Sequence, residues 1–142
     1  MILNDSIGNA MLLSIVLFIL TAVMLLFVGT LAYSKAFKAK NVIINNLESY
    51  KTYAAAETEI NNSLTTLGYQ RDEHFDCPKV NEKEAINDDT FKYCVYEYRT
   101  TGEKYYYKVI TYTQFNFPIV GKLVTTKVSG ETKILGKKYN YD

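Results

Sequence analysis

The chain has few of the residues from which most catalytic sites are built. It contains one histidine, His74, two cysteines and no tryptophan. It also lacks a paired-histidine motif, a glycine-rich phosphate loop and a nucleophile elbow. His74 lies near Cys77, but no second close pair of metal ligands accompanies them. We therefore expect a non-enzymatic protein with no catalytic, cofactor-binding or metal-binding residues, in which His74 is exposed to solvent.

A strong charge of either sign is also lacking. The formal net charge is +1, so no global attraction draws the chain to nucleic acid. The charge is unevenly distributed, because residues 72–89 are mainly acidic and residues 91–142 are mainly basic. The acidic stretch does not have the spacing of an EF-hand calcium loop. We interpret the two stretches as a solvated loop and a solvated sheet, and we expect no nucleic-acid partner.

Charged side chains are missing altogether from residues 6–34, and residues 10–33 are almost wholly apolar. At about 1.5 Å per residue, a helix of this length exceeds the roughly 30 Å hydrocarbon core of a bilayer. Only a helix can cross as a single segment, because lipid offers the backbone no hydrogen-bond partner. Residues 1–34 are therefore predicted to be an N-terminal segment and transmembrane helix, with the lipid bilayer as first partner.

Two other interpretations of the apolar run fit less well. A cleaved secretory signal has a basic start and a shorter apolar stretch. Residues 1–8 contain no Lys or Arg, and their one charged side chain is Asp5. A buried helix of a soluble protein needs a larger surrounding fold than the rest of this chain supplies. The run is best explained as a retained membrane anchor.

The helical pattern continues beyond the apolar run. No glycine or proline occurs in residues 35–67, and apolar residues recur at steps of three and four. Gly68 then supplies a helix stop signal. Residues 35–68 are predicted to form an amphipathic helix that continues the anchor, with a hinge near Lys40 and Asn41. The apolar stripe of this helix consists of Ile43, Leu47, Tyr50, Ala54, Tyr53, Ala56, Ile60, Leu64 and Leu67.

Residues 69–142 are predicted to be a loop followed by an antiparallel β head. Residues 71–90 are polar and suggest a loop, with a short helical turn near 82–86. Residues 91–99 and 104–113 are rich in Tyr, Val and Thr and are typical of a β-hairpin.

A second hairpin is predicted further along the chain. Phe117 and Pro118 interrupt the β pattern, and Ser129-Gly130 then suggests a two-residue turn between residues 122–128 and 131–135. The fold class is therefore α+β, with a long N-terminal helix packed on a small antiparallel sheet of about four strands. The short tail after these strands is expected to fray.

The two cysteines, Cys77 and Cys94, flank the acidic loop. A disulfide between them would close a loop of about 16 residues and add roughly 3 kcal/mol in the chain-entropy model. Such a pair implies an oxidising compartment. The alternative is two unpaired thiols, one of them buried.

The direction in which the chain crosses the membrane is not decided by these patterns. Lys35, Lys38 and Lys40 follow the apolar run and nothing basic precedes it, so the positive-inside rule places the C-terminal part in the cytoplasm. The cysteine pair favours the opposite direction.

The order of these parts resembles the plan of type IV pilin-like subunits, and part of the C-terminal sequence resembles TadE-like proteins. The similar sequence comprises Val109-Ile110-Thr111-Tyr112, residues 115–123 and residues 128–132. The order of elements is similar over most of the chain, whereas the sequence itself is similar only over residues 109–132. TadE-like proteins are minor, pilin-like components of the tight-adherence pilus and related machines.

The resemblance implies a head outside the cell and other pilin-like or secretion-apparatus subunits as partners. It also suggests Gly8 as a leader-peptide cleavage point that leaves Asn9 as the new N-terminus. The basic leader of such substrates is missing, and residues 10–14 lack the glutamate that pilin-like helices usually carry there.

The function expected from these patterns is that of a non-catalytic, membrane-anchored minor pilin or assembly subunit of a pilus or secretion apparatus. Close helix packing in lipid favours small residues, and Ser14, Ala22, Gly29 and Ala32 are candidates, unless they are ordinary lipid-facing residues. One alternative is a single-pass accessory subunit of a conjugation or secretion channel. Another is a membrane-tethered ligand-binding or sensor head that uses the tyrosine-rich sheet.

Overall fold

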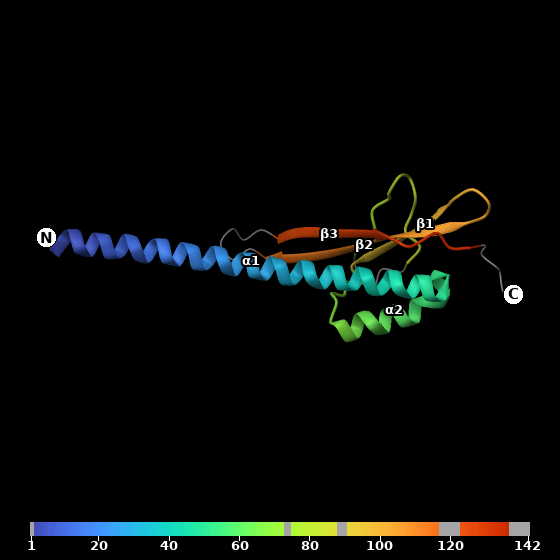
Figure 1. Ribbon diagram of the computed structural model, residues 1–142, viewed down its shortest axis with the longest axis horizontal. Helices are drawn as coiled ribbons and strands as arrows, with labels where there is room; N and C mark the ends of the chain where they lie inside the picture. Colours follow the sequence, from blue (N-terminus) through green and yellow to red (C-terminus); the bar gives the residue numbers. More distant parts are fainter. Residues whose placement is uncertain (1, 73–74, 88–90, 117–122, 137–142) are drawn as a thin grey trace.

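The computed structural model describes residues 2–72, 75–87, 91–116 and 123–136. The predictions for His74, Phe117, Pro118 and the tail after Gly136 lie outside the described residues. The predicted α+β fold class is confirmed, because two helices pack against an antiparallel sheet (Figure 1). The elements follow in the order α1 (Ile2–Tyr50), α2 (Tyr53–Leu67), β1 (Tyr93–Arg99), β2 (Tyr105–Asn116) and β3 (Leu123–Glu131).

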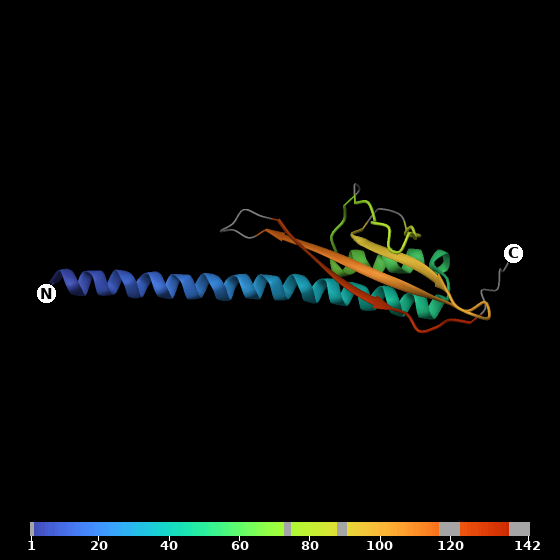
Figure 2. The ribbon, with the colours of Figure 1, turned by 90° about the horizontal axis from the view of Figure 1, so that it is seen from above.

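Helix α1 is one continuous helix with two different environments. Its N-terminal part extends away from the head, and its C-terminal part lies along the sheet (Figures 1 and 2). Ala36, Ala39, Ile43 and Leu47 are fully buried, at the three- and four-residue steps that keep side chains on one face of a helix. The predicted hinge at Lys40 is wrong, since α1 continues to Tyr50.

The helical region breaks instead at Lys51 and Thr52, so the prediction of one helix over residues 35–68 is wrong on this point. Lys51 adopts a left-handed φ of 68°, which the sequence does not signal because no glycine occurs there. Thr52 then caps α2, and its side-chain oxygen accepts a hydrogen bond from the Ala55 amide at 3.4 Å.

Helix α2 turns back along α1 (Figure 1). It buries Tyr53, Ala56, Ile60 and Leu64, and full burial of a Leu or Ile side chain contributes about 1.5–3 kcal/mol. This burial offsets the strain at Lys51. The predicted stop at Gly68 is confirmed, because Gly68 ends α2 in the left-handed conformation with a φ of 69°.

The sheet has the strand order β1-β2-β3, and both pairs are antiparallel. The predicted hairpin is confirmed, since β1 and β2 are joined through residues 100–104 with Tyr98 opposite Tyr106. The prediction of about four strands is corrected to three strands among the described residues.

The fourth strand is missing because the predicted turn at Ser129 and Gly130 lies inside β3. Ser129 pairs with Ile110 and Gly130 pairs with Val109. A Cβ at Gly130 would lie 2.9 Å from Ile44 Cδ1 and from Lys40 Cδ, so this glycine allows α1 to approach the sheet closely. Beyond β3, the Thr132 amide donates a hydrogen bond of 2.9 Å to the Tyr107 carbonyl oxygen, and Thr132 Oγ1 accepts one of 3.0 Å from the Tyr107 amide. Leu135 then forms an isolated bridge with Tyr105.

The sheet separates two apolar clusters. One face packs on the helices and contributes Tyr93, Val95, Tyr107 and Val109 to the main core. The opposite face contributes Cys94, Tyr96 and Ile110, which are covered by the loop that follows α2.

The loop contains a tight turn in place of the predicted helical turn at residues 82–86. Val80 and Lys83 exchange two backbone hydrogen bonds of 3.0 Å. The residues between them, Asn81 and Glu82, have φ values of 50° and 64°, which is the left-handed geometry of a type I′ turn.

Candidate functional site

The most unusual surface of the molecule is the N-terminal part of α1, residues 4–35, which we call the free segment. None of its side chains is buried. It contains a stretch long and apolar enough to cross a membrane, with a mean hydropathy of 3.0, and the rest of the described chain covers none of that stretch. Phe18 is 75% exposed and Leu26 is 72% exposed. An apolar surface of this extent requires a lipid or protein environment that the chain itself does not provide.

The polar side chains within the free segment are compatible with that environment. The hydroxyls of Ser14, Thr21 and Thr30 donate hydrogen bonds to the carbonyl oxygens of Ala10, Leu17 and Leu26, each one turn earlier. A hydroxyl whose proton is held by its own helix carries little penalty in a low-dielectric medium. These residues therefore do not interrupt the apolar character of the segment.

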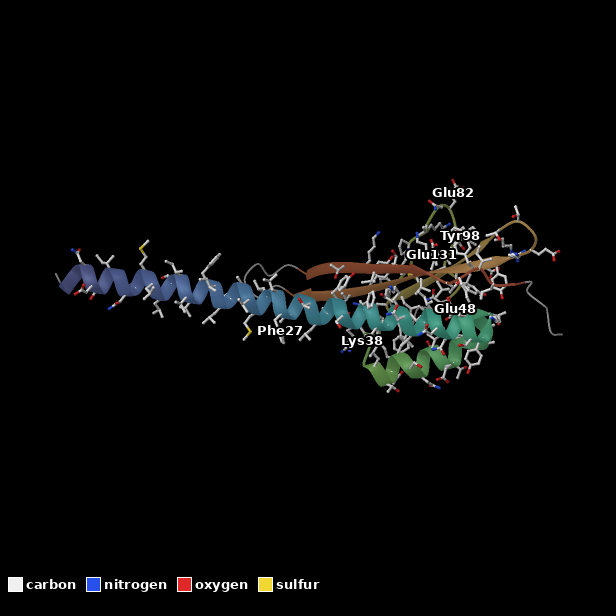
Figure 3. The ribbon with its side chains drawn as sticks, in the orientation of Figure 1. Phe27, Lys38, Glu48, Glu82, Tyr98 and Glu131 are labelled. Atoms are coloured by element: carbon white, nitrogen blue, oxygen red, sulfur yellow. A yellow bond between two sulfur atoms is a disulfide. The ribbon has the colours of Figure 1, made fainter. Side chains whose placement is uncertain are left out.

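The helix changes environment within one turn. Lys35 is exposed, whereas Ala36 is fully buried. Lys35 Nζ donates a hydrogen bond of 3.2 Å to the carbonyl oxygen of Gly68. Lys40 Nζ lies 4.2 Å from the centre of the Phe37 ring. Figure 3 shows Phe27 on the free segment and Lys38 close to the start of the head.

A groove of about 600 Å³ lies where the free segment meets the head, and we call it the junction groove. One wall is the face of α1 on which Val28, Leu31, Lys35 and Lys38 follow one another at steps of three and four. The opposite side comes from the end of α2, the residues after it and the end of β2. Its full lining is Val28, Leu31, Ala32, Ser34, Lys35, Lys38, Leu67, Tyr69, Gln70, Thr113 and Gln114.

The polar side of the junction groove is held by hydrogen bonds. Gln70 Nε2 donates to the carbonyl oxygen of Gln114 at 3.3 Å, and Lys92 Nζ donates to Gln114 Oε1 at 2.6 Å. The Tyr69 hydroxyl lies within 2.6 Å of the Lys92 carbonyl oxygen and 2.5 Å of the Tyr112 carbonyl oxygen. Burial raises the pKa of Tyr69, so it remains a neutral wall of the groove.

Cys77 and Cys94, the two residues predicted to pair, are joined by a disulfide with a Cα–Cα distance of 5.8 Å. This bond fastens the loop to the face of β1 that points away from the helices. Phe75 and Tyr112 make a ring contact at 5.0 Å in the same cluster.

Asn87 fastens the loop a second time, along the outer edge of β1. Its Oδ1 accepts a hydrogen bond of 2.8 Å from the Val95 amide, and its Nδ2 donates one of 2.8 Å to the Tyr93 carbonyl oxygen. The Ile86 amide donates to the Val95 carbonyl oxygen at 2.8 Å. The loop therefore occupies hydrogen-bonding groups that an edge strand would otherwise offer to another chain.

The tyrosines of the hairpin are packed within the fold. Tyr93, Tyr96, Tyr105 and Tyr107 are buried. Burial raises the pKa of Tyr96 and of Tyr107 to about 12. The half-buried Tyr98 and Tyr106 stack on each other with ring centroids 5.4 Å apart, as cross-strand partners. Their arrangement is that of sheet packing rather than of a row of exposed rings.

The other predicted site residues lie far from the head. Gly8 and Asn9 are exposed residues within α1, and cleavage between them stays a prediction. The described part of the chain contains no group of three His, Cys, Asp or Glu side chains arranged to hold a metal ion.

Sequence reasoning missed the junction groove and the role of Asn87. The groove combines residues from α1, α2 and β2 that are far apart in the chain. The sequence signals this groove only through Lys35 and Lys38, which directly follow the apolar run.

No protein-family model, curated protein or solved structure matches this chain. The architecture itself is pilin-like: a long apolar N-terminal helix packs on a small antiparallel sheet that carries a disulfide.

Proposed function

We propose that this protein is a non-catalytic, membrane-anchored minor pilin, or an assembly subunit of a pilus or secretion apparatus, of the TadE-like kind. The observation that carries the proposal is the continuity of α1. One unbroken helix supplies both the exposed apolar segment and the buried residues Ala36, Ala39, Ile43 and Leu47 of the head. A head fixed to its anchor in this way cannot swing freely about a linker.

The mechanism follows from this rigidity. The free segment holds the protein in the bilayer and offers a helical face to neighbouring helices, which pack in lipid through close contact. The head, built on the same helix, is then positioned at a set height above the membrane. In this role the sheet and loop are an assembly surface, and no step requires a reactive group.

The proposed location of the head is outside the cytoplasm. The bond between Cys77 and Cys94 supports this orientation, because disulfides persist in oxidising compartments. The lysines that follow the free segment are then an exception to the positive-inside rule.

The same observations support one alternative, a single-pass accessory subunit of a conjugation or secretion channel. The second alternative, a ligand-binding or sensor head, depends on an open tyrosine surface. Four hairpin tyrosines are buried, and the half-buried Tyr98 and Tyr106 stack on each other. This packing favours the assembly role over a ligand-binding head, which would need exposed tyrosine rings.

Membrane insertion is tested by fractionation of the full-length protein. Wild type is expected to resist alkaline carbonate extraction and to require detergent for solubility. Replacing both Leu17 and Leu20 by Lys should release the protein, because each central charge costs about 2.5–3.5 kcal/mol on insertion scales. The control Ile86→Lys changes an exposed apolar residue of the head and should remain in the membrane. A wild-type protein that is soluble and monodisperse without detergent contradicts the proposal.

The assembly role is tested by photo-crosslinking in cells. A crosslinking amino acid at Phe18 or Phe27 on the free segment should capture pilus or secretion subunits, whereas the same group at Ile134 on the head controls for random collision. Capture of channel proteins alone would support the alternative. N-terminal sequencing of the mature chain should begin at Asn9 if Gly8 is a cleavage point, and an intact Met1 would contradict processing.

A further inference from the structure

The junction groove has a graded composition along α1. Val28, Leu31 and Ala32 form its apolar end, and Lys35 and Lys38 form its cationic end. The apolar end belongs to the free segment and is continuous with its membrane-length stretch, none of which is buried by the rest of the described chain. One ligand could therefore contact the groove and the lipid around it at the same time.

The described residues place no carboxylate at the cationic end. They contribute no Asp or Glu to the groove lining, and neither Lys35 nor Lys38 forms an ion pair with any of them. Lys35 uses one of its three donors on the Gly68 carbonyl oxygen, at 3.2 Å, and this bond holds its ammonium at the groove. Gln70 and Gln114 add amide groups to the same rim. The site suits an anion with several acceptor oxygens.

The depth of Lys35 fits the headgroup layer of a bilayer, and the side chain of Lys38 can reach that layer from just beyond it. If the hydrocarbon region ends near Leu31, Lys35 lies roughly 6 Å beyond it and Lys38 roughly 10 Å beyond it along the helix. Headgroups occupy roughly 5–7 Å on each side of the hydrocarbon. Long lysine side chains reach this layer readily while their stems remain against apolar surface.

We propose that the junction groove binds one anionic phospholipid of the leaflet next to the head, with the phosphate between Lys35 and Lys38 and the acyl chains against Val28 and Leu31. This inference rests on the membrane anchoring in the proposed function and goes beyond it. The bound lipid would fill the space between α1 and the end of β2 and fix how far the head stands from the membrane. It also gives the lysines a role on the side of the membrane where the positive-inside rule does not expect them.

A lipid fits better than a free phosphate. A small anion would use only the lysine end of the groove and leave its apolar wall in contact with water. A phospholipid satisfies both ends, because its charge and its chains are arranged in the same order as the groove lining. Both ligands carry a phosphate group, so the test has to distinguish binding of the lipid from binding of free phosphate.

The experiment uses the full-length protein in nanodiscs of phosphatidylcholine with increasing phosphatidylglycerol, and native mass spectrometry of the protein released from them. One retained phosphatidylglycerol per protein is expected for wild type. The double variant Lys35→Gln/Lys38→Gln should weaken retention about 5- to 30-fold, since each lysine near an anionic surface contributes about a factor of five. Glutamine retains an amide donor for the Gly68 carbonyl.

The matched control is Lys104→Gln/Lys127→Gln, which removes the same charge from exposed positions on the hairpin and on β3 outside the groove lining. It should retain the lipid as wild type does. If both double variants lost phosphatidylglycerol equally, retention would depend on net charge alone, and the proposal would be overturned. Displacement of the lipid by millimolar inorganic phosphate would also overturn it, because the site would then recognise a free anion.

The outcomes separate this inference from the proposed function. A protein that resists carbonate extraction but shows no preference for phosphatidylglycerol refutes the lipid site alone. A protein that does not enter nanodiscs at all refutes the anchor, and the lipid site with it.

Discussion

The hydroxyl of Thr111 donates a hydrogen bond of 2.8 Å to the carbonyl oxygen of Ala36, which lies 75 residues earlier in the chain. Both residues are fully buried. The same hydroxyl lies 3.3 Å from the Val128 carbonyl oxygen, so one side chain links α1, β2 and β3. This contact lies where α1 passes from its free segment into the head.

Thr111→Val is expected to lower the free energy of unfolding by about 1 kcal/mol, because it removes the donor while preserving most of the volume. Chemical unfolding in detergent micelles, followed by near-ultraviolet circular dichroism, measures the change. Thr125→Val alters an exposed threonine of β3 and should stay within about 0.5 kcal/mol of wild type. Equal effects of the two changes would show that the Ala36 contact contributes nothing.

Asn87→Ala should be more damaging. It leaves the Val95 amide and the Tyr93 carbonyl oxygen without their 2.8 Å partners, and a buried group left unsatisfied costs about 1–3 kcal/mol. Amide hydrogen exchange should accelerate at Val95 before the rest of the sheet. Asn87→Asp keeps the acceptor for the Val95 amide, so exchange there should be slower than in the alanine variant. Unchanged protection at Val95 in both variants would contradict the assigned role.

Replacement of both Cys77 and Cys94 by Ser is expected to cost roughly 3 kcal/mol, since the bond closes a loop with a sequence separation of 17. The apolar cluster around Tyr96 and Ile110 should loosen first, because the disulfide attaches the loop that covers this cluster. Limited proteolysis should cut the variant between residues 75 and 87 while the helix-packed core stays intact. Simultaneous loss of both clusters would show that the loop is not a separate layer.

Gly130→Val should destabilise the head by about 1–3 kcal/mol, because side-chain atoms of Ile44 and Lys40 lie 2.9 Å from the position of a new Cβ. The cost should shrink in an Ile44→Ala background, where space has been made, and a double-mutant cycle measures that coupling. Gly136→Ala is the control, since nothing lies within 4 Å of its added Cβ. Additive effects of the Gly130 and Ile44 changes would contradict direct contact.

Alkaline pH should unfold the head. Burial raises the pKa of Tyr96 and Tyr107 from an ordinary value of 10.0 to about 12 in the folded state. The folded state therefore favours the protonated phenols, and this stabilisation is complete below pH 10 and is lost as the pH rises towards 12. Ultraviolet titration of phenolate, measured beside circular dichroism, should show a late ionisation step that coincides with unfolding. Full ionisation near pH 10 in a folded head would contradict it.

Much of the fold could be predicted because it depends on local pattern. The apolar run specifies the free segment, the apolar steps specify the buried faces around Ile43 and Ile60, and Gly68 marks the end of α2. Tyr and Val enrichment identified β1 and β2. The disulfide partners were also accessible, because the chain has only Cys77 and Cys94 to pair.

The sequence alone therefore determined that the chain has a membrane-length apolar helix, an amphipathic continuation and a tyrosine-rich antiparallel head. Only the tertiary structure decided where that helix turns back, how many strands form and where the junction groove opens. Lys51 adopts a left-handed conformation with no glycine signal, because the burial of α2 against α1 stabilises it. Gly130 pairs with Val109 inside β3, where the Lys40 and Ile44 side chains of α1 come close to it. Local patterns record the preference of each segment, whereas these features depend on surfaces brought together from distant parts of the chain.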